Sequence, residues 1–135
     1  LNSIRTEFLN LIDKDTESFN QLMAALKTKD PVAIEEATKN ACQIPLTTAN
    51  LTLKTVDLLM RTAQIGNINA ISDVGVGCLN LYASFYGAKY NVLINLKSIS
   101  DHNFKQDKIK YLQEIENQLI PKLDLIQKTV EGKMI

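Results

Sequence analysis

The sequence is poor in the residues that build most metal and disulfide sites. Its 135 residues include no tryptophan, one histidine, two cysteines and five glycines. Cys42, Cys78 and His102 are far apart and show no zinc-ligand spacing, so no metal site is expected. Both cysteines lie in apolar, helical surroundings, which predicts buried, reduced thiols in a cytoplasmic protein. A glycine-rich phosphate loop is also missing.

An excess of one charge sign and a long apolar run are also lacking. The chain has 15 basic and 15 acidic residues, and this balance argues against a nucleic-acid partner. The longest uncharged run, residues 74–88, is too short to span a membrane, and Asn80 and Ser84 make it too polar. No signal peptide is visible. The length suits one domain, and we assign residues 1–135 to it.

Helical periodicity dominates what is present. Apolar residues three, four or seven apart predict helices over residues 1–29, 31–43, 46–64, 69–96 and 102–131. Asp30 and Pro31 form a strong helix start, and Pro45 is expected to kink or restart the helix. Gly66 is expected to end a helix in the left-handed conformation, and Gly132 to end the last one. The predicted fold is an all-α antiparallel bundle of long, partly kinked helices.

The rest of the chain is organised around the predicted helix over residues 69–96. Its polar side chains step by seven, four, seven and four along one line: Asp73, Asn80, Ser84, Asn91 and Asn95. Because the other faces are apolar, we expect this line to be withdrawn from water and satisfied by neighbouring helices or a ligand. A small chain has few other helices with which to cover a helix that is this apolar. We therefore expect a homo-oligomer, a dimer meeting through this region; the alternative is full coverage within one chain.

Asp73 is the first candidate for chemistry, because it is the only acid in this helix. A carboxyl group withdrawn from water suits proton transfer or recognition of an amide-and-amine edge. The alternative is an ordinary acid in the first turn that faces the helix dipole.

Asn67, Asn91 and Asn95 are the second set of candidates. Their amides offer a donor and an acceptor together, which suits a heterocycle. Interhelical hydrogen bonding or capping is the alternative for each of them. Asp15 with Phe19 is a weaker candidate, since that pair is not specific.

Several short motifs occur in an order that resembles the cyclodeaminase family, the C-terminal domain of formiminotransferase-cyclodeaminases and its stand-alone bacterial relatives. The pieces cover nearly the whole chain and are Asp15-x-x-Ser18-Phe19, Ala41-x-x-x-Pro45-Leu46, Gly66-Asn67, Ser72-Asp73, Gly87-Ala88 and Asn91-Val92-x-x-Asn95-Leu96, followed by Asp101. Family members usually begin with a helix preceded by a glycine-rich segment. Residues 1–135 show neither, so we expect either that these parts lie outside the given sequence or that the chain is a divergent or truncated member.

The resemblance implies a folate one-carbon enzyme without a cofactor. Such enzymes close 5-formimidoyl-tetrahydrofolate to 5,10-methenyl-tetrahydrofolate and release ammonia, whereas some relatives hydrolyse the methenyl form to 10-formyl-tetrahydrofolate. It also implies a role for Asp73 in proton transfer or pterin recognition, and for Asn67, Asn91 and Asn95 in orienting the substrate. The expected cations for the glutamate tail are Arg61, Lys89 and Lys97. The competing class is a non-catalytic helical interaction protein.

Overall fold

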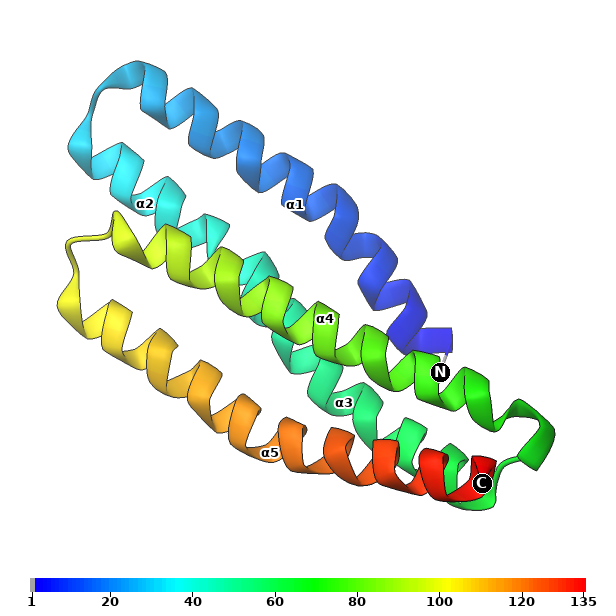
Figure 1. Cartoon of the computed structure of the whole chain (residues 1–135). Helices are drawn as coiled ribbons and strands as arrows, with labels where there is room; N and C mark the ends of the chain where they lie inside the picture. Colours follow the sequence, from blue (N-terminus) through cyan, green and yellow to red (C-terminus); the bar gives the residue numbers. More distant parts are fainter. Residues whose placement is uncertain (1) are drawn as a thin grey trace.

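The computed structural model describes residues 2–135 and confirms the all-α antiparallel bundle (Figure 1). Its helices are α1 (Asn2–Thr28), α2 (Pro31–Ala41), α3 (Gln43–Ile65), α4 (Ile71–Lys97) and α5 (His102–Met134). A short 3-10 helix, η1 (Ile68–Ala70), precedes α4. Helices α2 and α3 follow one another along one arm, and both ends of the chain lie at the same end of the bundle (Figure 1).

The predicted start of α2 is confirmed. The Asp30 carboxylate accepts a hydrogen bond from the Val32 N–H at 3.1 Å, and Pro31 occupies the first helical position. Helix α2 ends at Ala41 and α3 begins at Gln43, slightly before the predicted break. Pro45 therefore lies in the first turn of α3, where its missing N–H removes no helical hydrogen bond.

Gly66 ends α3, as predicted, but the predicted left-handed conformation was wrong, because its φ is −70°. A Cβ atom at this position would collide with the Thr62 carbonyl, so close backbone approach is what requires a glycine here. Helix α5 does not stop at Gly132 but continues to Met134.

The last turn of α5 caps the end of α3. The Lys133 Nζ atom donates hydrogen bonds to the carbonyls of Ala63 and Gln64, at 2.6 and 2.8 Å. These carbonyls have no partner within their own helix, so the lysine satisfies groups that would otherwise need water. This contact gives the part of α5 beyond Gly132 a structural role.

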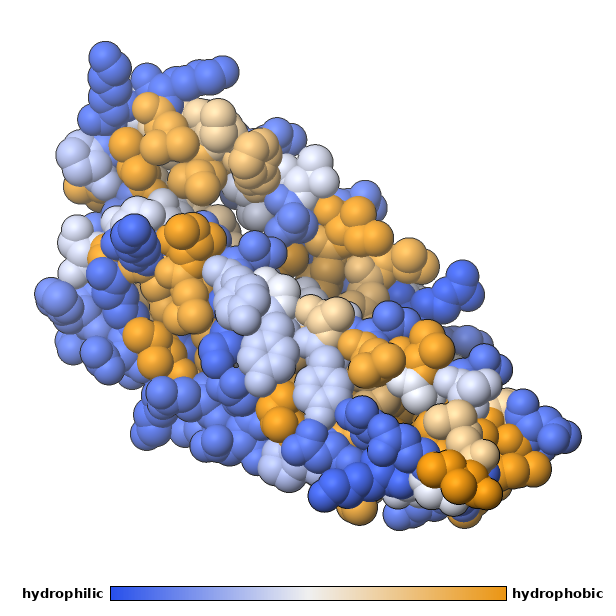
Figure 2. All heavy atoms as spheres, in the orientation of Figure 1, coloured by the Kyte–Doolittle hydropathy of each residue, from blue (hydrophilic) through white to orange (hydrophobic). Residues whose placement is uncertain are grey.

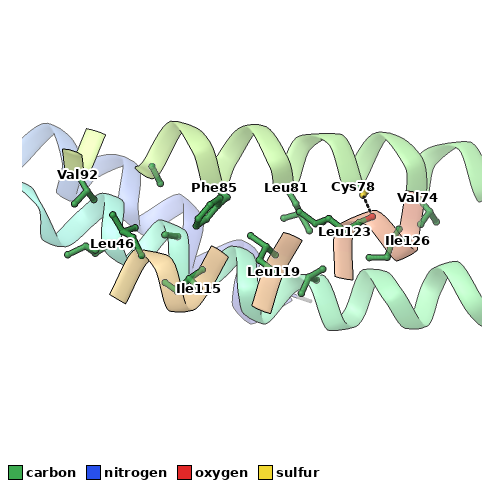
Figure 3. Close-up of a cluster of buried hydrophobic side chains, with 14 of the residues drawn as sticks. Leu46, Val74, Cys78, Leu81, Phe85, Val92, Ile115, Leu119, Leu123 and Ile126 are labelled. Carbon is green, nitrogen blue, oxygen red and sulfur yellow. Dashed lines mark hydrogen bonds between the residues drawn. The ribbon is translucent and has the colours of Figure 1, made fainter. Parts of the chain in front are cut away.

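The hydrophobic core lies between α3, α4 and α5 (Figure 3). Phe85, Leu119 and Leu123 are fully buried there, and the buried Cys78 donates its S–H to the Leu123 carbonyl at 3.4 Å. Cys42 is also buried, and both cysteines are free thiols, as predicted. No helix within residues 2–135 is long and apolar enough to cross a membrane.

Ion pairs join the helices around this core. Lys39 of α2 contacts Asp101 at 2.7 Å, and Asp101 also caps α5 by accepting from the Phe104 N–H. The hydrogen bond from Lys39 is the main cause that lowers the pKa of Asp101. The Asp101 N–H in turn donates to Glu35, so the start of α5 is tied to α2.

Replacing Leu119 with alanine tests the core. Because Leu119 is fully buried, Leu119→Ala should lower the free energy of unfolding by about 2–5 kcal/mol. The matched control is Leu125→Ala, since Leu125 is 52% exposed on the same helix and should change stability by less than about 0.5 kcal/mol. Urea denaturation followed by circular dichroism measures both. Equal effects would contradict the assigned core.

Cys42 should make the chain sensitive to alkaline pH. Burial raises the pKa of this thiol from 9.0 to about 11, so only the unfolded state ionises between these values. The buried neutral thiol therefore contributes its full stabilisation below pH 9. Between pH 9 and pH 11 the free energy of unfolding should fall by on the order of 2 kcal/mol. Urea denaturation across this range should show a steeper loss for the unmodified chain than for Cys42→Ala. Parallel losses would contradict the assignment.

Candidate functional site

A groove runs between α1 and the α3–α4 pair. It consists of two adjoining hollows of about 370 and 180 Å³, which share Asp15, Pro45 and Asn91. The surface is visibly hollowed between α1 and α4, with hydrophobic side chains along both (Figure 2). These volumes are in the range of small-molecule sites.

The groove exists because α1 lies at the edge of the bundle. Leu11 is its only buried residue, and its packing is mainly against α2 and α3. Ile12 and Phe19 line the groove and are 62% and 58% exposed. Such apolar walls are available to the flat rings of a ligand.

Polar groups without a partner line the groove between these apolar side chains. The Asp15 carboxylate forms no ion pair with any described residue. The Asn91 side chain also has no hydrogen-bond partner within residues 2–135. The Thr16 and Thr48 hydroxyls donate to carbonyls of their own helices at 3.2 and 3.1 Å, which leaves their lone pairs free. Together these groups offer acceptors and an amide donor to one heterocycle.

Asn95 lines the narrower hollow but also has a structural role. Its side-chain nitrogen donates to the Ala41 carbonyl at 3.4 Å, and the side chain is half-buried. This is the interhelical hydrogen bond that was the alternative interpretation. Asn91 and Asn95 are thus the two predicted asparagines that the fold brings together in the groove.

Three other predicted residues lie at the far end of the bundle, where α3 ends and α4 begins. Asp73 is in the first turn of α4 and is exposed. Asn67 caps η1, because its side-chain oxygen accepts a hydrogen bond from the Asn69 N–H at 3.0 Å. This is the capping role that was the alternative to substrate binding. Arg61 is exposed near the end of α3.

The cations expected to bind a glutamate tail do not line the groove. Lys89 is held against α5, where its Nζ atom pairs with Glu116 at 2.6 Å and lies 5.6 Å from the centre of the Tyr86 ring. Lys97 is exposed in the last turn of α4, one helical turn beyond Ile94, which lines the narrower hollow.

The expectation that the polar line of α4 is withdrawn from water was wrong for a single chain. Asp73, Asn80, Ser84 and Asn91 are exposed, and Asn95 is half-buried. The reason is that α3 and α5 cover the opposite face of α4, which carries its buried side chains.

Asp15 gives only a weak signal in the sequence. Its neighbours Asp13, Lys14 and Glu17 made it look like part of a solvated charged turn. The signal that identified it was the short motif that also contains Ser18 and Phe19, and these three residues lie together in the groove.

Comparison with known proteins decides the family. The formiminotransferase-cyclodeaminase family matches residues 1–114. The chain belongs to this family. It is 30% identical to a methenyltetrahydrofolate cyclohydrolase from Methylorubrum extorquens, over 97% of this chain and 67% of that protein. It is 38% identical to a formimidoyltransferase-cyclodeaminase from Dictyostelium discoideum, over 75% of this chain and 20% of the larger protein.

A solved structure shares the fold. The formiminotetrahydrofolate cyclodeaminase of Thermotoga maritima superposes with a TM-score of 0.94 at 30% identity, covering 99% of this chain and 67% of that one. In this cyclodeaminase-family chain the motif residues form two separate groups. Asp15, Pro45 and Asn91 lie in the groove, and Asn67 and Asp73 lie at the far end of α4.

Proposed function

We propose that the chain is a formimidoyltetrahydrofolate cyclodeaminase and that the groove holds the folate. The observation that carries the proposal is an unpaired carboxylate, Asp15, and an unpaired amide, Asn91, on the two walls of one apolar groove. A pterin presents adjacent ring and amino N–H groups, which a carboxylate accepts in pairs. The Asn91 amide would complement the neighbouring carbonyl and ring nitrogen.

The reaction needs a proton to be moved between nitrogens. Nitrogen N10 of the substrate attacks the formimidoyl carbon, and a tetrahedral carbon forms between N5 and N10. A proton reaches the amino nitrogen, the bond from this nitrogen to the carbon breaks, and ammonia leaves. We assign the pterin edge to Asp15 and the proton transfer to Asp73, because a carboxyl group suits either role. Asp73 lies outside the groove of its own chain, so this role requires a second copy that brings its own Asp73 to the groove.

The alternative activity is methenyltetrahydrofolate cyclohydrolase. The similarity to the Methylorubrum extorquens protein, which extends over 97% of this chain, supports it. In that reaction water adds to the same carbon, and the bond to N5 breaks to leave the 10-formyl form. Both reactions pass through a tetrahedral carbon, so the same groove serves either one.

The glutamate tail would leave the groove at its Asn95 end. Lys97 is the cation nearest to this exit along α4, and we assign it the first contact with the tail carboxylates. The side chains of Arg61, Lys89 and Asn67 do not line the groove of one chain. Their roles in substrate binding stay predictions.

Self-association is part of the proposal. Helix α4 exposes large apolar side chains, among them Val76 and Ile94 at 57% and 62%. Such a face is unusual on a monomer and favours a homo-oligomer that meets through α4.

The groove assignment is tested by Asp15→Asn. Loss of charge-assisted hydrogen bonds to the pterin should lower kcat/KM by about 10-fold to 100-fold, mainly through KM. Asp13→Asn is the matched control, because Asp13 is an exposed acid on the same helix outside the groove. Steady-state assays with 5-formimidoyl- and 5,10-methenyl-tetrahydrofolate measure both variants. Similar values for the two variants would remove Asp15 from the site.

The second test is Asp73→Asn. Without its carboxyl group, kcat should fall by about 100-fold or more, because general acid–base catalysis contributes that much. Asp107→Asn, an exposed acid on α5, is the control. Methenyl absorbance and ammonia release are followed in parallel, and ammonia formation distinguishes the cyclodeaminase from the cyclohydrolase. Unchanged turnover would exclude Asp73, and absence of folate binding would favour a non-catalytic interaction protein.

A further inference from the structure

Helices α2 and α3 form one arm whose helical course is nearly continuous across their junction (Figure 1). Cys42, the single residue between them, has helical backbone angles, with a φ of −74° and a ψ of −23°. The Cys42 carbonyl accepts a hydrogen bond from the Leu46 N–H at 3.1 Å, which is the helical pattern of residues four apart. In such an arm the Ala41 carbonyl is expected to accept from the N–H of residue 45.

Pro45 interrupts this pattern at one carbonyl. A proline has no backbone N–H, so Pro45 cannot donate to Ala41. Within α3 nothing is lost, because Pro45 lies in the first turn, but the carbonyl at the end of α2 is left without its helical donor. Since Ala41 and Pro45 are both buried, this carbonyl needs another donor in place of the missing one.

Asn95 of α4 supplies the replacement. Its side-chain nitrogen donates to the Ala41 carbonyl at 3.4 Å. Asn91 lies one turn earlier on the same helix, and its amide has no partner among the residues that the structure describes. The two asparagines therefore differ in what they offer: the amide donor of Asn95 is used by the protein, whereas that of Asn91 is available to a ligand.

The hydrogen bond from Asn95 lies in the wall of the narrower hollow. Four residues that line this hollow belong to the two sides that the bond joins, Ala41 and Pro45 on one side and Asn91 and Asn95 on the other. Only Pro45 and Asn91 of these four also line the wider hollow. The distance between these two residues therefore sets the width of the groove where its hollows join, and the bond from Asn95 fixes that distance.

We propose that Asn95 is a positioning residue, whose amide replaces the donor that Pro45 lacks and thereby holds the Pro45 wall of the groove in place against Asn91. In this role Asn95 affects the substrate only through the wall, and Asn91 makes the direct contact. The proposal rests on the proposed function for the identity of the ligand. The exchange of donors itself can be tested without any ligand.

The exchange of donors is tested by combining Asn95→Ala with Pro45→Ala. Pro45→Ala restores a backbone N–H that can donate to the Ala41 carbonyl along the arm, so the Asn95 amide is then no longer needed. We expect Asn95→Ala to lower the urea midpoint of the unmodified chain. In the Pro45→Ala background the same change should lower the midpoint by less than about half as much. Circular dichroism during urea denaturation measures all four chains.

The matched control for this cycle is Asn80→Ala. Asn80 is an exposed asparagine on the same helix and does not line either hollow. Its effect on the urea midpoint should be the same with and without Pro45→Ala, because the two sites share no partner. Equal effects of Asn95→Ala in the two backgrounds would overturn the exchange of donors.

Hydrogen exchange gives a second measurement of the same point. In Pro45→Ala, and in the double variant with Asn95→Ala, the new N–H at position 45 should exchange at least about 100-fold more slowly than an unprotected amide. Nuclear magnetic resonance measures this rate directly. Exchange at the unprotected rate would show that this N–H does not take over the Ala41 carbonyl, which contradicts the proposal.

Steady-state kinetics with 5-formimidoyl- and 5,10-methenyl-tetrahydrofolate test the positioning role. Because the wall shifts while Asp15 and Asn91 keep their side chains, Asn95→Ala should raise KM about 10-fold and lower kcat much less. When Pro45→Ala is already present, adding Asn95→Ala should change KM by less than about 3-fold. A direct contact between Asn95 and the substrate would instead give the same rise in KM in both backgrounds, and that result would overturn the positioning role.

The two proposals fail in different ways. An unmodified chain that turns over neither folate would contradict the proposed function alone, because the urea cycle and hydrogen exchange need no substrate. An active chain in which Pro45→Ala rescues neither the stability nor the KM of Asn95→Ala would contradict the positioning role and leave the proposed function in place.

Discussion

The burial of one face of α4 between α3 and α5 is the constraint on which the rest of this structure depends. Phe85 and Val92 are fully enclosed there, and Ala88 leaves only 5% of its surface exposed. Helical geometry allows about half of a helix to face its partners, so covering this face leaves the opposite one free. The free face carries the polar line and exposed apolar side chains such as Val76 and Ile94.

The position of α1 follows from the same packing. Because α3, α4 and α5 already enclose a core, α1 is left to pack on the edge with Leu11 as its single buried residue. A helix that packs so thinly leaves space beside it, and this space is the groove. Asp15 and Asn91 face that space unpaired, which an exposed groove permits and a closed core would not.

Ion pairs hold three lysines of this chain at positions outside the groove. Lys89 contacts Glu116 of α5, Lys122 contacts Asp57 of α3 and Lys39 contacts Asp101. These contacts join the arms of the bundle and leave the centre of the groove with an acid and an amide. This polarity suits the N–H edge of a pterin more than the carboxylates of a glutamate tail.

The division of the family residues between two ends of α4 connects assembly with chemistry. If each site needs one chain for recognition and another for proton transfer, the monomer is folded but incomplete. The core does not depend on a second copy, because its buried residues are enclosed within one chain. Oligomer formation would then control activity without controlling folding.

The sequence by itself determined the helices, the cap at Asp30 and the burial of both cysteines. These features follow from periodicity and from contacts only a few residues apart, such as the bond from Val32 to Asp30. Only the tertiary structure decided which face of α4 is covered, that Asp15 lies in the groove and that Lys89 is held by Glu116. Those outcomes depend on helices distant in sequence, and the same periodic pattern is compatible with several arrangements of neighbours.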